Sequence, residues 1–311
     1  MLSCIRSQVL TAFEVIVIDD GSSSATRATY AELWKTLDAR FTLIELGSLN
    51  APGVGPSVAR NTGIEASSGA IITFCDDDDF WTNEQHLAMM ADVFKAEPQL
   101  DLYIANQRAV SWDGKLERSD WLPALLAIVR GRSRSHAHGY RLQLADLLRA
   151  GGFAQLNILA VSRATAVAIG GFWTRTSYEE DRDFFWRAAD AARAIFFNPD
   201  LVAQHNVPNP ARRDNLSRSY TQAERWMIST LVSQHIAISV TSGAIGAMCQ
   251  SYEGDILRRL SQSLSGEGKH ALGLLYARRA LAARVSLKWT LYTMSLGLAM
   301  GWRQLTGKGV A

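Results

Sequence analysis

The 311-residue sequence has few cysteines and no long apolar run, and each absence excludes a class of protein. Its three cysteines are far apart and form no CxxC or Cys/His cluster, which excludes a disulfide scaffold and a zinc knuckle. No stretch reaches the roughly 18 to 20 apolar residues of a membrane-spanning helix. Residues 1–10 also lack the apolar core of a secretory signal. The sequence therefore predicts a protein of a reducing compartment, located in the cytoplasm.

An excess of one charge is missing as well. The 32 Lys and Arg nearly cancel the 30 Asp and Glu, so the net charge is +2 and any phosphate must be bound locally. This balance predicts no nucleic-acid partner. The basic stretch 130–141 contains His136 and His138, and we interpret it as a solvent-exposed loop rather than a metal site. Attraction of an anionic acceptor or a membrane surface is the alternative.

Proline is absent after residue 217, where the pattern becomes mainly helical. We therefore expect a domain over residues 1–217 and a helical C-terminal extension over 218–311. Near its end, residues 288–303 have tryptophans and cations flanking an apolar run too short to span a bilayer. That segment is either a helix packed on the protein's own core or an interfacial helix that contacts a membrane peripherally.

In the first part, apolar β-type runs alternate with helical patterns. The runs over residues 13–18, 41–46 and 70–75 are joined by helical segments over 25–37 and 56–67. Such alternation predicts an α/β sheet with right-handed crossovers, and ligands bind such sheets beyond the carboxyl ends of the strands. One aspartate cluster follows the first run and another follows the third, so both are expected on the same rim of one sheet.

The second cluster has four consecutive aspartates, Asp76 to Asp79. On an extended backbone, Asp76 and Asp78 point to one side and offer hard oxygen ligands to Mg²⁺ or Mn²⁺. The alternative is a solvated acidic turn or a helix N-cap. Asp20, in the first cluster, could accept hydrogen bonds from a base or a ribose, although Asp-Gly-Ser is also a common turn sequence.

Together these motifs resemble a known family. FEVIVIDDGSS (13–23), GPSVARNTGIEASSGAIITFCDDDDFW (55–81), and GGF (170–172) followed by EEDRDFFWR (179–187) are similar to the inverting family-2 glycosyltransferases. The resemblance implies a three-layer α/β/α GT-A fold, Rossmann-like, that transfers sugar from a nucleotide-diphosphate donor to an acceptor hydroxyl. It also implies a divalent cation, Mn²⁺ or Mg²⁺, and a glycan or lipid-linked acceptor in cell-surface polysaccharide or glycoconjugate synthesis.

The resemblance also assigns roles to individual residues. Carboxylates at two places are expected to hold the cation and to remove the acceptor proton, and the remaining residues to hold the nucleotide. The assignments are Asp20, Arg60 and Asp76 for the nucleotide-sugar, Asp76 and Asp78 for the cation with Asp78 the direct ligand, Asp181 as general base in preference to Glu180, and His205 toward the metal or diphosphate. Asp79 is expected to support the loop, and Asp77 to have no role.

The sequence departs from the family pattern at its start. Relatives usually begin with an apolar strand, whereas residues 1–11 already read as the helix that follows it, so the first strand is expected to be missing. Either the start codon is assigned too late, or the chain is a truncated, inactive homologue that binds nucleotide-sugars.

Two other enzyme classes are rivals. A haloacid-dehalogenase-type phosphatase would place its Asp-x-Asp nearer the start, with Thr or Val at position 79. A nucleotidyltransferase would need a Gly-rich phosphate loop with a lysine, and none follows the first strand.

Overall fold

A computed structural model describes residues 1–47, 53–209 and 220–305. The chain forms two compact units, Met1–Asn215 and Leu216–Ala311. The boundary expected between residues 217 and 218 lies outside the described residues. Each unit has buried apolar residues of its own.

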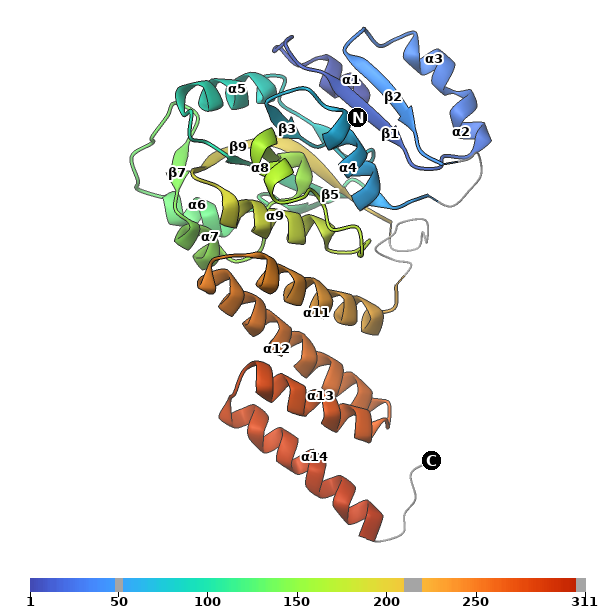
Figure 1. Ribbon diagram of the computed structural model, residues 1–311, viewed down its shortest axis with the longest axis vertical. Coiled ribbons are helices and arrows are strands. Elements are labelled where there is room, and N and C mark those ends of the chain that lie inside the picture. Colours follow the sequence, from blue (N-terminus) through green and yellow to red (C-terminus); the bar gives the residue numbers. More distant parts are fainter. Residues whose placement is uncertain (48–52, 210–219, 306–311) are drawn as a thin grey trace. The chain divides into compact units, whose positions relative to one another are not determined.

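The first unit contains a small parallel sheet of two strands, β1 (Val15–Asp19) and β2 (Phe41–Glu45), in which Asp19 lies opposite Glu45. Both strands occur where the apolar runs predict them. The helix expected over 25–37 is instead two short helices, α2 (Ser24–Ala28) and α3 (Tyr30–Trp34), which meet at Thr29. Figure 1 shows these helices beside the two strands.

A second sheet of seven strands forms the centre of this unit, in the order β3-β8-β5-β9-β4, with β6 on β5 and β7 on β9. Its long strands β5 and β9 run parallel, and the other ladders are antiparallel. The strands are β3 (Ile71–Thr73), β4 (Phe80–Trp81), β5 (Leu102–Ser111), β6 (Leu116–Arg118), β7 (Tyr140–Leu142), β8 (Leu159–Ser162) and β9 (Ile195–Val207).

The expectation of one sheet carrying both aspartate clusters is wrong. In the described part of the chain, β1 pairs with β2 alone and β3 pairs with β8 alone, so the clusters follow strands of different sheets. Helix α4 (Pro56–Ala66) connects the two sheets along the chain and packs on β1, where Gly63 lies against Ile18.

The core of the first unit is aromatic and fully buried. Tyr103 of β5 stacks on Phe196 of β9, and Phe172 stacks on Phe184 with ring centres 4.2 Å apart. Further helices are α1 (Leu2–Arg6), α5 (His86–Ala96), α6 (Pro123–Val129), α7 (Leu144–Ala150), the 3₁₀ turn η1 (Leu156–Ile158), α8 (Arg163–Ala168) and α9 (Glu180–Ala191). This mixed α/β architecture confirms the predicted fold class.

The second unit is helical, as expected from its lack of proline. It contains α11 (Gln222–Ser239), α12 (Gly243–Gly266), α13 (His270–Ala283) and α14 (Leu287–Leu305). Helix α11 begins with a capping box in which the side chains of Thr221 and Glu224 bond reciprocally to backbone amides. Among the described residues, no helix is both long and apolar enough to cross a bilayer.

Helix α14 has one buried side and one apolar side that faces solvent. Trp289 is buried, and its indole donates a hydrogen bond of 3.0 Å to the carbonyl of Ala277 on α13. The helix therefore packs on its own unit, in agreement with one of the two interpretations of this segment. Exposed apolar side chains recur at helical spacing on it: Leu287, Leu291, Met294, Leu298 and Trp302.

Candidate active site

The aspartate loop between β3 and β4 is held by its last member. Asp79 is 2% exposed and accepts a 2.7 Å hydrogen bond from the amide of Asn206. Nδ1 of His205 lies 3.0 Å from Asp79 Oδ2. The β4–β9 ladder, with Phe80 opposite Gln204, sets this alignment. Asp79 therefore supports the loop, as the sequence predicts.

Asp78 has a strongly perturbed carboxyl group. Although the residue reaches solvent, desolvation of its carboxylate and repulsion from the other three aspartates raise the pKa of Asp78 to about 6, against the opposing effect of His205. A divalent cation would relieve this concentration of negative charge, and carboxylate oxygens are the ligands that Mg²⁺ and Mn²⁺ prefer. The residues present therefore fit a hard cation at Asp76 and Asp78.

Arg60 joins the aspartate loop to the acidic motif on α9. Its Nη2 donates a hydrogen bond of 2.9 Å to Asp76 Oδ1, and its Nη1 donates one of 2.8 Å to Glu180 Oε1. Burial opposes the charge of Arg60, but the two carboxylates outweigh burial and raise its pKa. The guanidinium also lies 5.5 Å from the centre of the Phe172 ring. The aspartate loop and the start of α9, more than 100 residues apart in the chain, thus contact the same guanidinium.

The start of α4 is held by Asp20. The amides of Val54 and Gly55 donate hydrogen bonds of 2.7 and 2.8 Å to its two carboxylate oxygens. A side chain at Gly53 would collide with Asp20, because a Cβ atom there would lie 2.5 Å from its carbonyl oxygen. Asp20 and Arg60 are therefore connected through a single helix.

The same helix positions the Gly-Gly-Phe segment, a contact that no local pattern in the sequence predicts. The Asn61 side chain donates to the carbonyl of Phe172 at 2.9 Å and accepts from its amide at 2.7 Å. Ser57 donates to the carbonyl of Thr176 at 3.1 Å. Because Ser57, Arg60 and Asn61 are spaced by three and four residues, they share one face of α4.

Helix α9 begins at a strained residue. Glu179 has a φ of 59°, the only positive φ of a non-glycine residue in the described part of the chain. In the first turn, desolvation and the neighbouring Glu180 carboxylate raise the pKa of Asp181 to about 7, against the Arg182 amide and Arg60. A carboxylate with this pKa is suited to accept a proton near neutrality.

Asp183 has a different role from Asp181. It is fully buried and forms an ion pair with Arg187, with Nη2 and Oδ2 2.5 Å apart. Arg187 also donates to the carbonyls of Ile169 and Gly171, at 2.6 and 2.8 Å. The i,i+4 pair is a structural link that holds α9 to the Gly-Gly turn.

His205 lies beside the aspartate loop, against Asp79. Burial alone would lower the pKa of His205, but the neighbouring Asp79, Asp78 and Asp76 carboxylates outweigh burial and raise it. Nδ1 faces Asp79, so Nε2 is the nitrogen left for a metal or a diphosphate. The ring edge packs on Trp121, at 5.6 Å between centres. The Asn215-Leu216-Ser217 sequence that follows lies outside the described residues.

Sequence reasoning missed Asn206. Its side chain donates a 2.5 Å hydrogen bond to the carbonyl of Asp78, while its amide binds Asp79. Only its position next to His205 could have indicated this role.

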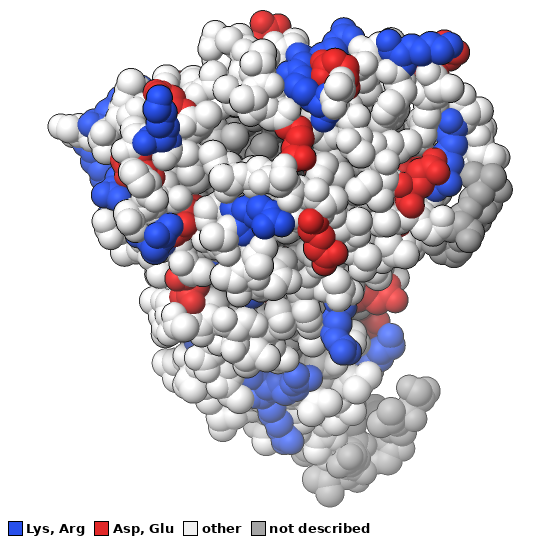
Figure 2. Space-filling view, turned by 45° about the horizontal axis from the view of Figure 1, so that its top comes forward, with Lys and Arg blue, Asp and Glu red and all other residues white. Residues whose placement is uncertain are grey.

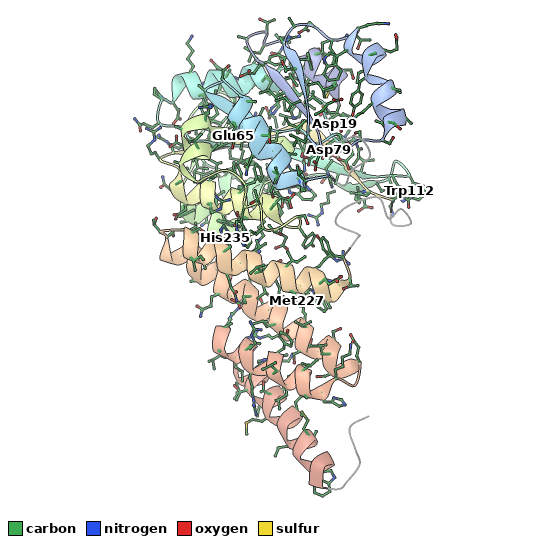
Figure 3. All side chains as sticks on the ribbon, turned by 45° about the vertical axis from the view of Figure 1, so that its right-hand side comes forward. Asp19, Glu65, Asp79, Trp112, Met227 and His235 are labelled. Atoms are coloured by element: carbon green, nitrogen blue, oxygen red, sulfur yellow. The ribbon has the colours of Figure 1, made fainter. Side chains whose placement is uncertain are left out.

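Figure 3 labels Asp79 in the loop and Asp19 at the end of β1. Asp19 accepts hydrogen bonds from the amide of Ser22 and from Arg27, so it supports its own turn.

Similar proteins define the class. The crystal structure of S. aureus TarS 1-349 in complex with UDP-GlcNAc aligns with a TM-score of 0.61 at 16% identity, over 93% of this chain and 78% of that one. The mannosyltransferase PcManGT from Pyrobaculum calidifontis, in complex with GDP-Man and Mn²⁺, aligns with a TM-score of 0.56 at 18% identity, over 99% and 83%. At these identities the likeness shows the fold, which is that of GT-A glycosyltransferases.

The sequence comparisons give the family. A model described as glycosyl transferase family 2 matches residues 1–156, half of the chain, so the chain belongs to this family. Glycosyltransferase EpsH of Bacillus subtilis (strain 168) is 34% identical over 120 residues, 38% of this chain and 32% of that protein. The UDP-Glc:alpha-D-GlcNAc-diphosphoundecaprenol beta-1,3-glucosyltransferase WfgD of Escherichia coli is 34% identical over 92 residues, 29% and 34%. The matched segments thus span about a third of these relatives.

The bridging role of Arg60 can be tested by stability. Arg60→Met leaves Asp76 and Glu180 without their shared cation, and we expect the free energy of unfolding to fall by about 2 kcal/mol. The double variant Arg60→Met/Glu180→Gln lacks the uncompensated carboxylate of Glu180, so part of the lost free energy of unfolding should be recovered. Denaturant unfolding of the wild type, both single variants and the double variant measures the coupling. If the effects of the two substitutions on the free energy of unfolding were strictly additive, the contact between Arg60 and Glu180 would not contribute as proposed.

Proposed function

We propose that the protein is a metal-dependent, inverting glycosyltransferase that moves a sugar from a nucleotide-diphosphate donor to an acceptor hydroxyl. One observation carries the proposal: Arg60 joins Asp76 of the aspartate loop to Glu180, the neighbour of Asp181. A site for the donor diphosphate and a candidate general base therefore belong to one constellation. Glu180, Asp181 and His205 lie beyond the residues that the family model matches, so their roles rest on this geometry.

On the donor side, Asp76 and Asp78 would hold Mn²⁺ or Mg²⁺, which neutralises the charge that builds on a departing diphosphate. Arg60 and Nε2 of His205 supply further positive or hydrogen-bonding groups nearby. Asp20, at the start of α4, has carboxylate oxygens that can also accept hydrogen bonds from a base or a ribose. Complexes of similar folds with UDP-GlcNAc and with GDP-Man support a nucleotide-sugar as ligand.

On the acceptor side, Asp181 accepts the proton of the acceptor hydroxyl as its oxygen attacks the anomeric carbon. The bond from that carbon to the diphosphate oxygen breaks in the same displacement, so the configuration inverts and no enzyme nucleophile is needed. The raised pKa of Asp181 matches this task, whereas Glu180 is engaged by Arg60. We therefore assign Asp181 as the base, with Glu180 as the alternative.

A second candidate is a nucleotide-sugar-binding protein without transferase activity. It is favoured by the separation of the two sheets, because no described strand joins β1 to β3 beside the nucleotide pocket. Transfer by the purified chain distinguishes the two candidates.

We further propose a cytoplasmic enzyme of cell-surface polysaccharide or glycoconjugate synthesis, with a glycan or lipid-linked acceptor. The three free cysteines support the compartment, and the lipid-linked acceptor in the name of the E. coli relative supports the acceptor class. The exposed apolar stripe of α14, with Lys288 exposed beside it, supports peripheral contact with an anionic membrane surface.

Donor binding should depend on the cation through Asp78. We expect Asp78→Asn to weaken Mn²⁺-dependent donor binding by about tenfold or more, equivalent to about 1.4 kcal/mol. Asp77→Asn removes the same charge from the same loop and is the matched control. Calorimetric titration with UDP-, GDP- and dTDP-sugars, with and without Mn²⁺, makes the measurement. Equal binding without Mn²⁺, or by Asp78→Asn, would remove the metal assignment.

Transfer should depend on Asp181 and on pH. Asp181→Asn should bind donor normally but lose about 10² to 10⁴-fold in kcat, because the acceptor proton has no base. In the wild type, kcat should rise with pH through about 7, since the base acts only when deprotonated and its pKa is raised. Asp181→Asn should lack this rise, whereas Glu180→Gln should keep it. Unimpaired transfer by Asp181→Asn would exclude it as the base.

Membrane contact should depend on the apolar stripe. In Leu291→Gln/Leu298→Gln, binding to anionic phospholipid vesicles should weaken by about tenfold or more, because burial of a leucine contributes about 1.5 to 3 kcal/mol. Met227 on α11 is also exposed, and Met227→Gln is the matched control (Figure 3). Vesicle cosedimentation measures the binding. Binding that is equal for all three proteins would argue against the stripe as the contact surface.

A further inference from the structure

A cluster of two histidines and one aspartate lies outside the aspartate loop and the α9 motif. His136 and His138 follow α6 in the basic segment 130–141, and Asp92 belongs to α5. One ligand atom from each residue lies within 4.8 Å of the others. The sequence interpretation was a solvent-exposed loop, whereas both histidine side chains are only partly exposed, at 18% and 28%.

Packing against the central sheet fixes the histidine segment. The His136 ring meets the edge of Phe196, a fully buried residue of β9, at 6.2 Å between centres. The amide of Ser135 donates a 3.1 Å hydrogen bond to the carbonyl of Gly139. A side chain at Gly139 would collide with the carbonyl of Phe197, so the backbone passes directly against β9. The backbone of the segment and the His136 imidazole are therefore held against the core.

Two of the three spacings between the ligand atoms are close to those of a tetrahedral metal site, and the third is within 4.8 Å. Nε2 of His136 and Nε2 of His138 lie 3.5 and 3.4 Å from Asp92 Oδ2. A tetrahedron with metal–ligand bonds of about 2.0 to 2.1 Å has edges of about 3.3 to 3.4 Å. Small side-chain movements would bring the three atoms around one ion, with a fourth position open to water.

We propose that Asp92, His136 and His138 form a second metal site, which binds a transition-metal cation of the Zn²⁺ class. Two imidazoles and one carboxylate suit Zn²⁺, Ni²⁺ or Co²⁺, whereas an all-carboxylate set suits Mg²⁺ or Mn²⁺. The two sites therefore select different cations. A bound ion would connect α5 to the histidine segment and stabilise the edge of the sheet where β7 pairs with β9.

The surrounding charges permit a cation. Of the four arginines in the segment, two are paired with carboxylates, Arg132 at 2.7 Å from Asp146 and Arg141 at 3.2 Å from Glu97, and Arg134 donates to the carbonyl of Ala137. His136 Nδ1 accepts a 3.3 Å hydrogen bond from the amide of His138. Coordination through Nε2 places the proton of neutral His136 on Nδ1, so the site gives up this one long hydrogen bond.

The test is titration of the full chain with Zn²⁺ in the presence of excess Mg²⁺, which occupies the aspartate loop. We expect one saturable Zn²⁺ site in the wild type and at least tenfold weaker binding in Asp92→Asn and in His138→Gln. With Co²⁺, the wild type should show the visible absorption of tetrahedral coordination, and both variants should lose it. Zn²⁺ should also raise the melting temperature of the wild type but not that of the variants.

Two controls separate this site from other sources of binding. His270→Gln removes a histidine of the second unit and should leave Zn²⁺ affinity unchanged, and Asp78→Asn should retain the same Zn²⁺ site. Circular dichroism checks that Asp92→Asn and His138→Gln are folded. The proposal is overturned if these folded variants bind Zn²⁺ as tightly as the wild type, or if Asp78→Asn abolishes the site.

Discussion

The double ion pair of Arg60 is the interaction on which the candidate active site depends. One guanidinium, 20% exposed, faces carboxylates from two motifs that are distant in sequence. A planar group with donors on two nitrogens can hold both carboxylates in a fixed geometry, which the single ammonium of a lysine cannot do. Because Asn61 follows on the same face of α4, the helix also fixes the Gly-Gly-Phe segment. The aspartate loop, the start of α9 and the Gly-Gly-Phe segment are thereby positioned by one element.

The carboxylates of this region form two groups, one paired with cationic side chains, to which Asp76 and Glu180 also belong through Arg60, and one without such a partner. Asp19, Asp79 and Asp183 are buried and lie against Arg27, His205 and Arg187, respectively. Asp78 and Asp181 form no ion pair with a described residue, and the pKa of each is raised. Two such carboxylates close to other acids destabilise the fold, and arrangements of this kind are found most often at binding and catalytic sites. Figure 2 shows acidic and basic side chains interspersed on one face of the molecule.

The sequence predicted β1, β2 and β3, each near an apolar run, and the support by Asp79, because buried runs and local spacing determine these features. It did not predict that β1 and β3 belong to different sheets, since strand pairing depends on partners distant in the chain. For the same reason it missed Asn206 and the link from Arg60 to Glu180: nothing near either residue in sequence specifies its contacts. The histidine segment was misread because its burial comes from Phe196, 60 residues further on.

Asp76 connects the two halves of the proposed chemistry. Its carboxylate faces Arg60 and is also a candidate ligand of the cation, so a bound cation competes with Arg60 for the same negative charge. If Asp76 bound the cation instead of Arg60, the guanidinium could pair with both Glu180 and a donor phosphate. Desolvation and Glu180 raise the pKa of Asp181 and Arg60 opposes that rise, so in the proposed enzyme a change in the groups that Arg60 contacts would alter the pKa of Asp181.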